Sequence, residues 1–188
     1  MATVSVPLMT ADEFFDFAHR PDNEGKFLEL ERGEVVVMPP AGKYHGFVCL
    51  NVGSILREFG KKRKKGYACS NDAGVIVERN PDTVRGPDIS FFEDDQQPKT
   101  MERQYSTTTP KLVVEILSPH DQPGKLLRRI KQYLSRGIEL VWVVDPENRF
   151  VSVYRPGREY QIISESEEIT GEDVLPDLRC AVAEFFDG

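Results

Sequence analysis

Cysteine is scarce in this sequence. Its 188 residues contain only Cys49, Cys69 and Cys180, far apart and without a CxxC pair. This spacing predicts neither a disulfide framework nor a thiolate zinc site. Long hydrophobic runs are also lacking, since no stretch approaches the roughly 18–20 apolar residues of a membrane-spanning helix. The first eight residues have neither the basic nor the apolar region of an export signal. We therefore expect a protein of the reducing cytoplasm with no membrane partner.

An excess of basic residues is absent as well. Lys and Arg number 24 against 31 Asp and Glu, which gives a formal net charge of -7. This balance excludes a polybasic tail protein and disfavours a protein that coats nucleic acid by bulk charge, but it leaves room for a local basic surface. The strings GxxxxGK[ST], GxGxxG and GxSxG do not occur, so phosphate-cradling loops and nucleophile elbows have no support.

The patterns that are present predict one mixed α/β domain over residues 1–188. The apolar fraction of 39% suffices for a sizeable core. Thr10 and Glu13 stand at capping-box spacing and predict the start of a helix. Polar residues over 93–110 predict a long surface loop. Periodicity predicts further helices over 44–59 and from Pro123 to a C-cap at Gly137, and strands over 26–31, 34–38, 74–78, 88–92, 111–117, 138–144, 150–154 and 160–163, with a closing apolar segment over 182–186.

One residue stands out in the apolar run over 111–117. Such a run of Leu, Val and Ile is typical of a central strand covered on both faces, yet it contains Glu115. An ionised carboxylate buried among apolar side chains costs several kcal/mol unless it is paired or bound to a cation. Alternation places Glu115 on the same face as Val113 and Leu117, so we expect it to need a partner.

A second carboxylate, Asp88, opens the preceding strand directly after Gly86 and Pro87. Two carboxylates on adjacent strands repel each other unless a divalent cation lies between them, and hard oxygen ligands suit magnesium or manganese. The alternative is structural: Glu115 forms an ion pair with an arginine of the following helix, and Asp88 caps a turn. Spacing alone leaves both interpretations open.

An ordered set of motifs in this chain resembles the Uma-type restriction endonuclease family, within the PD-(D/E)XK nuclease superfamily. The likeness runs from about Met9 to Tyr154 and covers most of the chain. PD alone is a weak signal, but the ordered set is specific. Its members are FLELERGEVVVMPP over 27–40, then His45, GPDISF over 86–91, LVVEILSP over 112–119, QYLSRGI over 132–138 and WVVDP over 142–146.

The resemblance implies a restriction-endonuclease-like core with a central mixed β-sheet flanked by helices. It implies that Asp88 and Glu115 bind Mg²⁺ or Mn²⁺, which activates water against a phosphodiester. Glu29 matches an additional acidic residue of the family, but it alternates with Leu28 and Leu30 as a solvent-facing strand residue would, so surface exposure is an equal expectation. His45 matches a histidine at the start of the family's next helix; the alternative is a histidine satisfied within the apolar face of that helix.

The third signature residue of the superfamily is missing here. A lysine two positions after the glutamate is usual, but this position is Leu117, and the resemblance points instead to a cation on the next helix. Arg129 occupies the matching position. Arginine cannot act as a general base, but it can stabilise a developing phosphorane charge. Lys131 is favoured by chemistry, and because it flanks the opposite edge of the apolar stripe from Arg129, at most one of the two should face the site.

A basic run, Lys61-Lys62-Arg63-Lys64-Lys65, follows the predicted end of the helix over 44–59. These side chains can supply phosphate contacts that weaken with salt, which would reconcile the acidic total with a DNA substrate. A solvated loop is the alternative. Because cutting both strands commonly needs two sites, we also expect a homodimer.

Three functions are therefore compared. The first is a metal-dependent DNA endonuclease, and the second is a catalytically inactive nucleic-acid-binding or protein-binding module on the same fold, favoured by the missing lysine. A glycosidase using Asp88 and Glu115 as acid and base has no aromatic sugar platform to support it. We find no histidine or basic neighbour that argues for a thiolate nucleophile, so the cysteines are expected to be buried or incidental. Trp142 is expected in the core.

Overall fold

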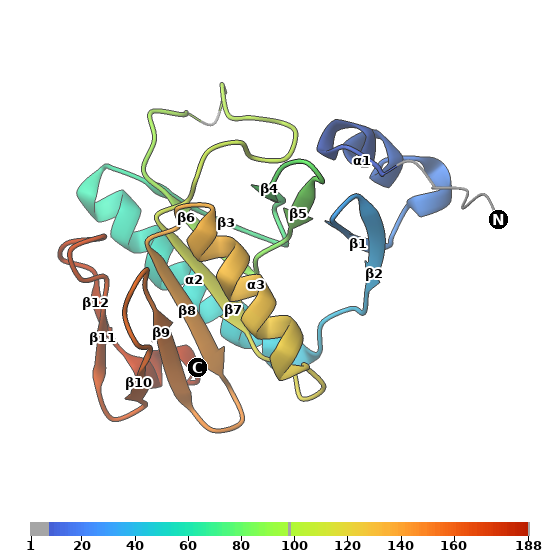
Figure 1. The fold of residues 1–188 in the computed structure, drawn as a ribbon. Coiled ribbons are helices and arrows are strands. Elements are labelled where there is room, and N and C mark those ends of the chain that lie inside the picture. Colours follow the sequence, from blue (N-terminus) through green and yellow to red (C-terminus); the bar gives the residue numbers. More distant parts are fainter. Residues whose placement is uncertain (1–7, 98, 188) are drawn as a thin grey trace.

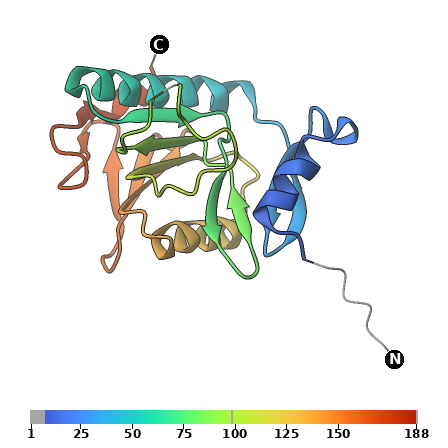
Figure 2. The ribbon, with the colours of Figure 1, turned by 90° about the horizontal axis from the view of Figure 1, so that it is seen from above.

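A six-stranded β-sheet lies between two long helices in the computed structural model, which describes residues 8–97 and 99–187 (Figures 1 and 2). The first seven residues, part of the segment where no export signal is expected, lie outside this description. The strand order is β10-β9-β8-β7-β6-β3, and only β7 and β8 are parallel neighbours. The strands are β3 (Tyr67–Ser70), β6 (Ile89–Phe92), β7 (Leu112–Ile116), β8 (Leu140–Asp145), β9 (Phe150–Tyr154) and β10 (Gln161–Ser164).

Both faces of this sheet are buried under a helix. Helix α2 (Lys43–Arg63) packs Val48, Val52 and Leu56 against one face, and α3 (Pro123–Ser135) packs Ile130 and Tyr133 against the other. Figure 2 shows the three layers edge-on. Because a helix covers each face of the sheet, nearly every side chain of β7 and β8 is buried, which explains why these strands are almost continuously apolar. No helix in the described part of the chain combines the length and the apolar character needed to cross a membrane.

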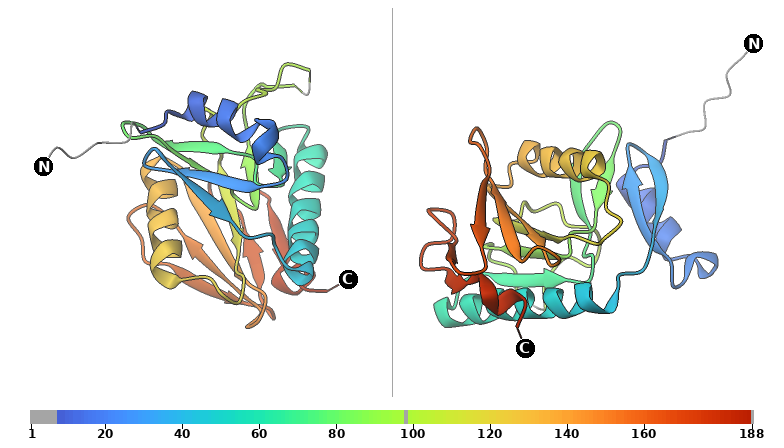
Figure 3. Two further views of the ribbon diagram at one scale, coloured as in Figure 1. Left: turned by 90° about the vertical axis from the view of Figure 1, so that its right-hand side faces the viewer. Right: turned by 90° about the horizontal axis from the view of Figure 1, so that it is seen from below.

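A second, four-stranded antiparallel sheet lies beside the first (Figure 3). Its order is β2-β1-β5-β4. Helix α1 (Ala11–Ala18) packs Phe14 against Leu30 and Val84 of this sheet. The capping box expected at Thr10 is present. The strands are β1 (Phe27–Glu31), β2 (Glu34–Met38), β4 (Val75–Glu78) and β5 (Thr83–Arg85).

The C-terminal segment closes the core on the α2 side. Strands β11 (Glu168–Thr170) and β12 (Arg179–Ala181) pair with each other, and the 3₁₀ helix η2 (Val182–Phe185) packs Phe185 against Trp142. A further 3₁₀ turn, η1 (Pro21–Asn23), follows α1. Trp142 is fully buried, so its predicted place in the core is confirmed.

The mixed α/β architecture and the central mixed sheet flanked by helices are confirmed. Four short strands, β3, β5, β11 and β12, were not predicted, and the closing apolar segment forms η2. The predicted end of α2 is wrong, because the helix continues to Arg63 and ends on Lys64, which has a φ of 53°. Lys61 to Arg63 thus form the last helical turn, where cations are favoured by the helix dipole.

Candidate active site

Asp88 and Glu115 lie side by side on adjacent antiparallel strands. Ile89 of β6 pairs with Val114 of β7 and Ser90 with Val113, so one further step of this register places Asp88 opposite Glu115. The Oδ2 atom of Asp88 accepts the backbone N–H of Ile116 at 2.7 Å. This bond crosses to the neighbouring strand, so Asp88 does not cap a local turn. Like charges in this position repel each other.

Glu115 is buried and has its own cation. Its Oε1 accepts the hydroxyl of Tyr133 and, at 3.3 Å, the guanidinium of Arg129, both from α3. Its Oε2 accepts no hydrogen bond from any residue that the structure describes. Burial raises the pKa of Glu115 to about 7 despite the charge of Arg129, and the charge of Asp88 adds to the rise. The ion pair with the following helix, expected under the structural alternative, is therefore present.

Arg129 also connects the two sheets, because it contacts Glu29 of β1 as well as Glu115 of β7. Its Nη1 and Nη2 donate to both carboxylate oxygens of Glu29, at 2.9 and 3.0 Å. Arg85 donates to Oε2 of Glu29 and the backbone N–H of Gly86 donates to Oε1, each at 2.9 Å. Burial alone would lower the pKa of Arg129, but the charges of Glu115 and Glu29 raise it, so its guanidinium stays charged.

Glu29 is 5% exposed, so the expectation of a solvent-facing residue is wrong. The reason is that β1 is covered on both faces: α1 packs over Leu30, and the side chains of Arg85 and Arg129 cover Glu29. Four N–H donors occupy its two oxygens, so a metal would have to displace arginine or backbone contacts to bind there.

Asp88 has a cation from the opposite helix. The Nε2 atom of His45, in the first turns of α2, lies 3.3 Å from Oδ1 of Asp88. The hydrogen bond to Asp88 and a second one to Cys49 raise the pKa of His45 to about 10, so the ring is charged at neutral pH. The Nδ1 atom of His45 lies 3.5 Å from the Sγ of Cys49. The expectation that no cysteine has a nearby histidine is therefore wrong, because one helical turn brings Cys49 beside His45.

Asp72 is a third carboxylate near this pair, and sequence reasoning missed it. Burial, followed by the charges of Asp88 and Glu29, raises its pKa. It lies in the turn after β3, with a φ of 53°. A Cβ atom added to Gly86 would lie 2.8 Å from the Cβ of Asp72, so the glycine of the Gly86-Pro87-Asp88 motif permits this close approach. The Asn71-Asp72 pair is a sequence typical of a turn and could have marked this position. However, the location of Asp72 in the fold depends on β3, which was not predicted.

The remaining predicted cations lie elsewhere. Lys131 is exposed and contacts none of these carboxylates, so α3 presents Arg129 to the site instead. The basic run lies at the far end of α2, and at 1.5 Å per residue the helix separates Lys61 from His45 by roughly 24 Å. Lys61 pairs with Glu58, and Arg63 and Lys65 pair with Glu93. Among the described residues, Lys62 and Lys64 have no ion pair.

Two donor sets that share Asp88 can hold a divalent cation. Asp88 and Glu115 offer carboxylate oxygens, the ligands that Mg²⁺ and Mn²⁺ prefer. The Oε2 of Glu115 has no hydrogen bond to displace, so this pair fits such an ion. His45, Cys49 and Asp88 form the other set, with ligand atoms within 4.8 Å of one another.

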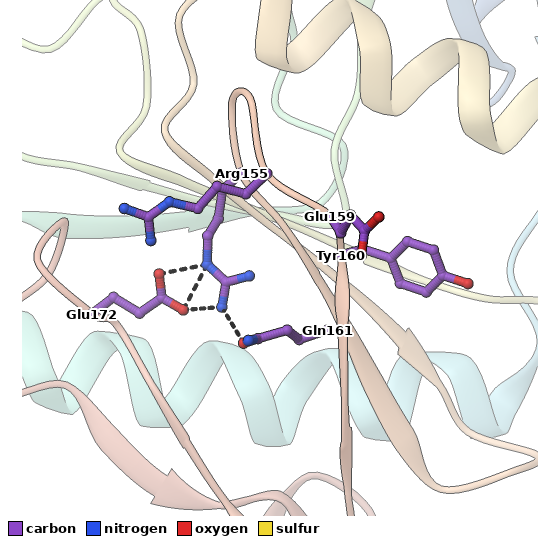
Figure 4. A pocket seen from close by; sticks show the side chains of 6 residues that line it. Arg155, Glu159, Tyr160, Gln161 and Glu172 are labelled. Atoms are coloured by element: carbon purple, nitrogen blue, oxygen red, sulfur yellow. Dashed lines mark hydrogen bonds and ion pairs between the residues drawn. The ribbon is translucent and has the colours of Figure 1, made fainter.

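A polar hollow also occurs at the opposite end of the large sheet, around the turn between β9 and β10. Figure 4 shows its lining, in which the guanidinium of Arg155 donates to both Glu172 and Gln161. The carboxylate of Glu172 neutralises the charge of Arg155 locally. The pairing of Val141 with Tyr154 places this end of β9 at the start of β8, whereas Glu115 pairs with Val143 near the other end. The hollow is therefore separate from the carboxylate pair.

Comparisons with known proteins agree on one family and fold. The profile of the Uma2 family, described as "Putative restriction endonuclease", matches residues 11–183. A crystal structure described as that of "a putative nuclease belonging to DUF820" from Anabaena variabilis ATCC 29413 is similar, with a TM-score of 0.78 and 22% sequence identity. The similarity covers 95% of this chain and 97% of that chain. No curated protein matches significantly.

The raised pKa of Glu115 predicts a pH-dependent stability. A carboxyl group that binds its proton more tightly in the folded chain stabilises the fold below about pH 4.5, and this contribution is lost as the pH rises through about 7. We expect the free energy of unfolding of wild type, measured with urea, to fall by roughly 3 kcal/mol relative to that of Glu115→Gln between about pH 4 and pH 8. Glu147→Gln, in an exposed turn, is the control and should run parallel to wild type. If the stability of Glu115→Gln changed with pH in the same way as that of wild type, the prediction would be contradicted.

Arg129 should matter more for stability than its neighbour Arg128. Arg129→Ala leaves Glu29 and Glu115 buried without their shared cation, which should cost about 3–5 kcal/mol in the free energy of unfolding. Arg128 is 64% exposed and pairs with Glu31 at the surface, so Arg128→Ala should cost less than about 1 kcal/mol. Denaturant titration measures both, and equal losses would exclude a central role for Arg129.

Proposed function

The chain belongs to the Uma2 family of restriction endonuclease-like proteins, and on this premise we propose that it is a divalent-metal-dependent endonuclease that hydrolyses phosphodiester bonds of DNA. The observation that carries the proposal is the pair of carboxylates on adjacent strands, where Asp88 stands opposite Glu115. Such a pair is unfavourable unless cations surround it. Arg129 and His45 supply two, and Oε2 of Glu115 remains for a third.

The side chains around this pair have distinct tasks in the proposed mechanism. Asp88 and Glu115 would hold a Mg²⁺ or Mn²⁺ ion, whose chemistry would be to lower the pKa of a bound water and to polarise a phosphoryl oxygen. Tyr133 and Arg129 hold Oε1 of Glu115 and stabilise its carboxylate form, while Ile116 fixes Oδ2 of Asp88 through its N–H. The guanidinium of Arg129 adds positive charge close to where the phosphate becomes more negative. It remains protonated, so it takes no proton from water.

DNA contact is proposed for the exposed lysines at the end of α2. The protein is acidic overall, so phosphate contacts need local cations. Lys62 and Lys64 have no carboxylate partner among the described side chains, unlike Lys61 and Lys65. The separation of roughly 24 Å from His45 corresponds to about seven base pairs of duplex at 3.4 Å each. One DNA segment can therefore span both ends of α2. Two copies, one for each strand, are the assembly that we propose, which light scattering tests.

One observation favours a second candidate, a binding module without catalysis. Arg129 already neutralises Glu115, and no lysine of α3 contacts the carboxylates in the described part of the structure. A protein in which the arginine only stabilises the fold would bind nucleic acid or protein without cleaving a phosphodiester.

Cleavage of supercoiled plasmid DNA separates the two functions. With Mg²⁺ or Mn²⁺ we expect nicked and linear products, and we expect Asp88→Asn and Glu115→Gln each to lower the rate at least about 1,000-fold, because each removes a metal ligand and its charge. Glu147→Gln, in an exposed turn and without a contact to the pair among the described residues, should cut at the wild-type rate. Binding of DNA without cleavage at any metal concentration would support the binding module, and cleavage that survives Asp88→Asn would refute the proposed site.

The salt dependence of DNA binding tests the proposed contacts. Each phosphate contact contributes about 0.9 to the slope of log K against log salt concentration. Lys62→Gln with Lys64→Gln should therefore reduce the slope by about 1.8 in a filter-binding or anisotropy titration. Arg20→Gln should leave the slope unchanged, because Arg20 follows α1 in the chain, and α1 lies across the molecule from the end of α2 (Figure 2). An unchanged slope in the double variant would place the DNA elsewhere.

A further inference from the structure

A nitrogen, a sulfur and an oxygen donor converge beside the carboxylate pair. His45 and Cys49 lie one turn apart on α2, and Asp88 reaches them from the start of β6. Sγ of Cys49 lies 3.5 Å from Nδ1 of His45, and Oδ1 of Asp88 lies 3.3 Å from Nε2. The three ligand atoms lie within 4.8 Å of one another. Neither Cys49 nor the sulfur–imidazole contact has a role in the proposed hydrolysis.

These donors suit a different ion from the carboxylate pair. Thiolate and imidazole prefer Zn²⁺ and similar borderline metals, whereas Mg²⁺ prefers oxygen. Bond lengths of about 2.0–2.3 Å put two ligands of a tetrahedral ion roughly 3.3–3.6 Å apart, and the contact between Sγ of Cys49 and Nδ1 of His45, at 3.5 Å, has a separation of this size. Asp88 contacts the other ring nitrogen, Nε2, so its carboxylate is the ligand that must turn toward an ion held by Sγ and Nδ1. Ligands four residues apart on one helix face are also an established arrangement for zinc.

We infer that His45, Cys49 and Asp88 form a site for a zinc-like divalent ion, distinct in its donors from the Asp88–Glu115 pair. Binding forms one metal–sulfur, one metal–nitrogen and one metal–oxygen bond, and the protons of the thiol and of the coordinating nitrogen leave to solvent. Three protein ligands leave a fourth tetrahedral position for water. The charge of Asp72, which acts on Cys49, His45 and Asp88, adds to the attraction for a cation.

The two sites share Asp88 and therefore compete for it. A zinc-like ion on His45 and Cys49 removes Oδ1 of Asp88 from the carboxylate pair, so its predicted effect on the proposed nuclease is inhibition. The existence of the site does not rest on the proposed function, because Cys49 and His45 bind the ion whether or not the chain cleaves DNA.

Cobalt(II) titration of the full chain, with its thiols reduced, tests the site without using activity. We expect one equivalent to give a thiolate-to-cobalt charge-transfer absorption that Zn²⁺ abolishes. Cys49→Ser and Cys49→Ala should lose this absorption and bind Zn²⁺ at least about 100-fold more weakly, measured by competition with a chromophoric chelator. Cys69→Ser is the matched control, since Cys69 is also half-buried but lies on β3, and it should keep the absorption. Glu115→Gln should keep it as well.

Two further measurements make each outcome decisive. Alkylation followed by mass spectrometry on wild type should show Zn²⁺ protecting Cys49 and not Cys69, which tests the site even where a Cys49 variant folds poorly. Calorimetry should show that Mg²⁺ binding depends on Glu115 and not on Cys49. Cobalt absorption that persists in Cys49→Ala, or wild type without thiolate absorption or protection of Cys49, overturns the inference. Loss of Mg²⁺ binding alone would count against the proposed function and leave this site intact.

Discussion

Repulsion between two neighbouring carboxylates at the edge of an apolar core is the interaction that the surrounding charges of this protein offset. Asp88 and Glu115 repel each other and lose hydration on burial, so each needs positive charge close by. The molecule supplies that charge from both sides of the six-stranded sheet: α2 brings His45 to Asp88, and α3 brings Arg129 to Glu115. The positions of both helices relative to the sheet are therefore coupled to the electrostatics of the site.

The strongest sequence signal was a polar residue in an apolar context. Glu115 stood out because the strand around it is covered on both faces, and its need for a partner followed from desolvation alone. Asp88 was placed correctly beside it because the two strands are adjacent in the sheet. The long amphipathic helices, the strands over 26–31 and 34–38 and the buried strands were also predictable, because each repeats a periodic pattern over several residues.

The missed features depend on contacts between distant segments. β3 and β5 have only four and three residues, too few for a clear period, and their absence from the prediction hid Asp72 and Arg85. The alternating pattern around Glu29 suggested a solvent-facing side chain, because alternation is typical of a strand with one buried face. In the structure, both faces of β1 are covered. The spacing of His45 and Cys49 was visible, but its meaning depended on Asp88, which the chain brings there only by folding.

Arg129 also has a consequence for the order in which the protein becomes functional. Its bonds to Glu29 span 100 residues of sequence and join the four-stranded sheet to the six-stranded one. Contacts of such long range form late in folding, since the loop between them must first be closed. Until the N-terminal sheet docks, Arg129 lacks the partner that orients it against Glu115. A nascent or partly unfolded chain therefore lacks the contact that orients Arg129 against Glu115. Under the proposed function, the site is complete only after the two sheets have docked, which limits cleavage by an incompletely folded chain.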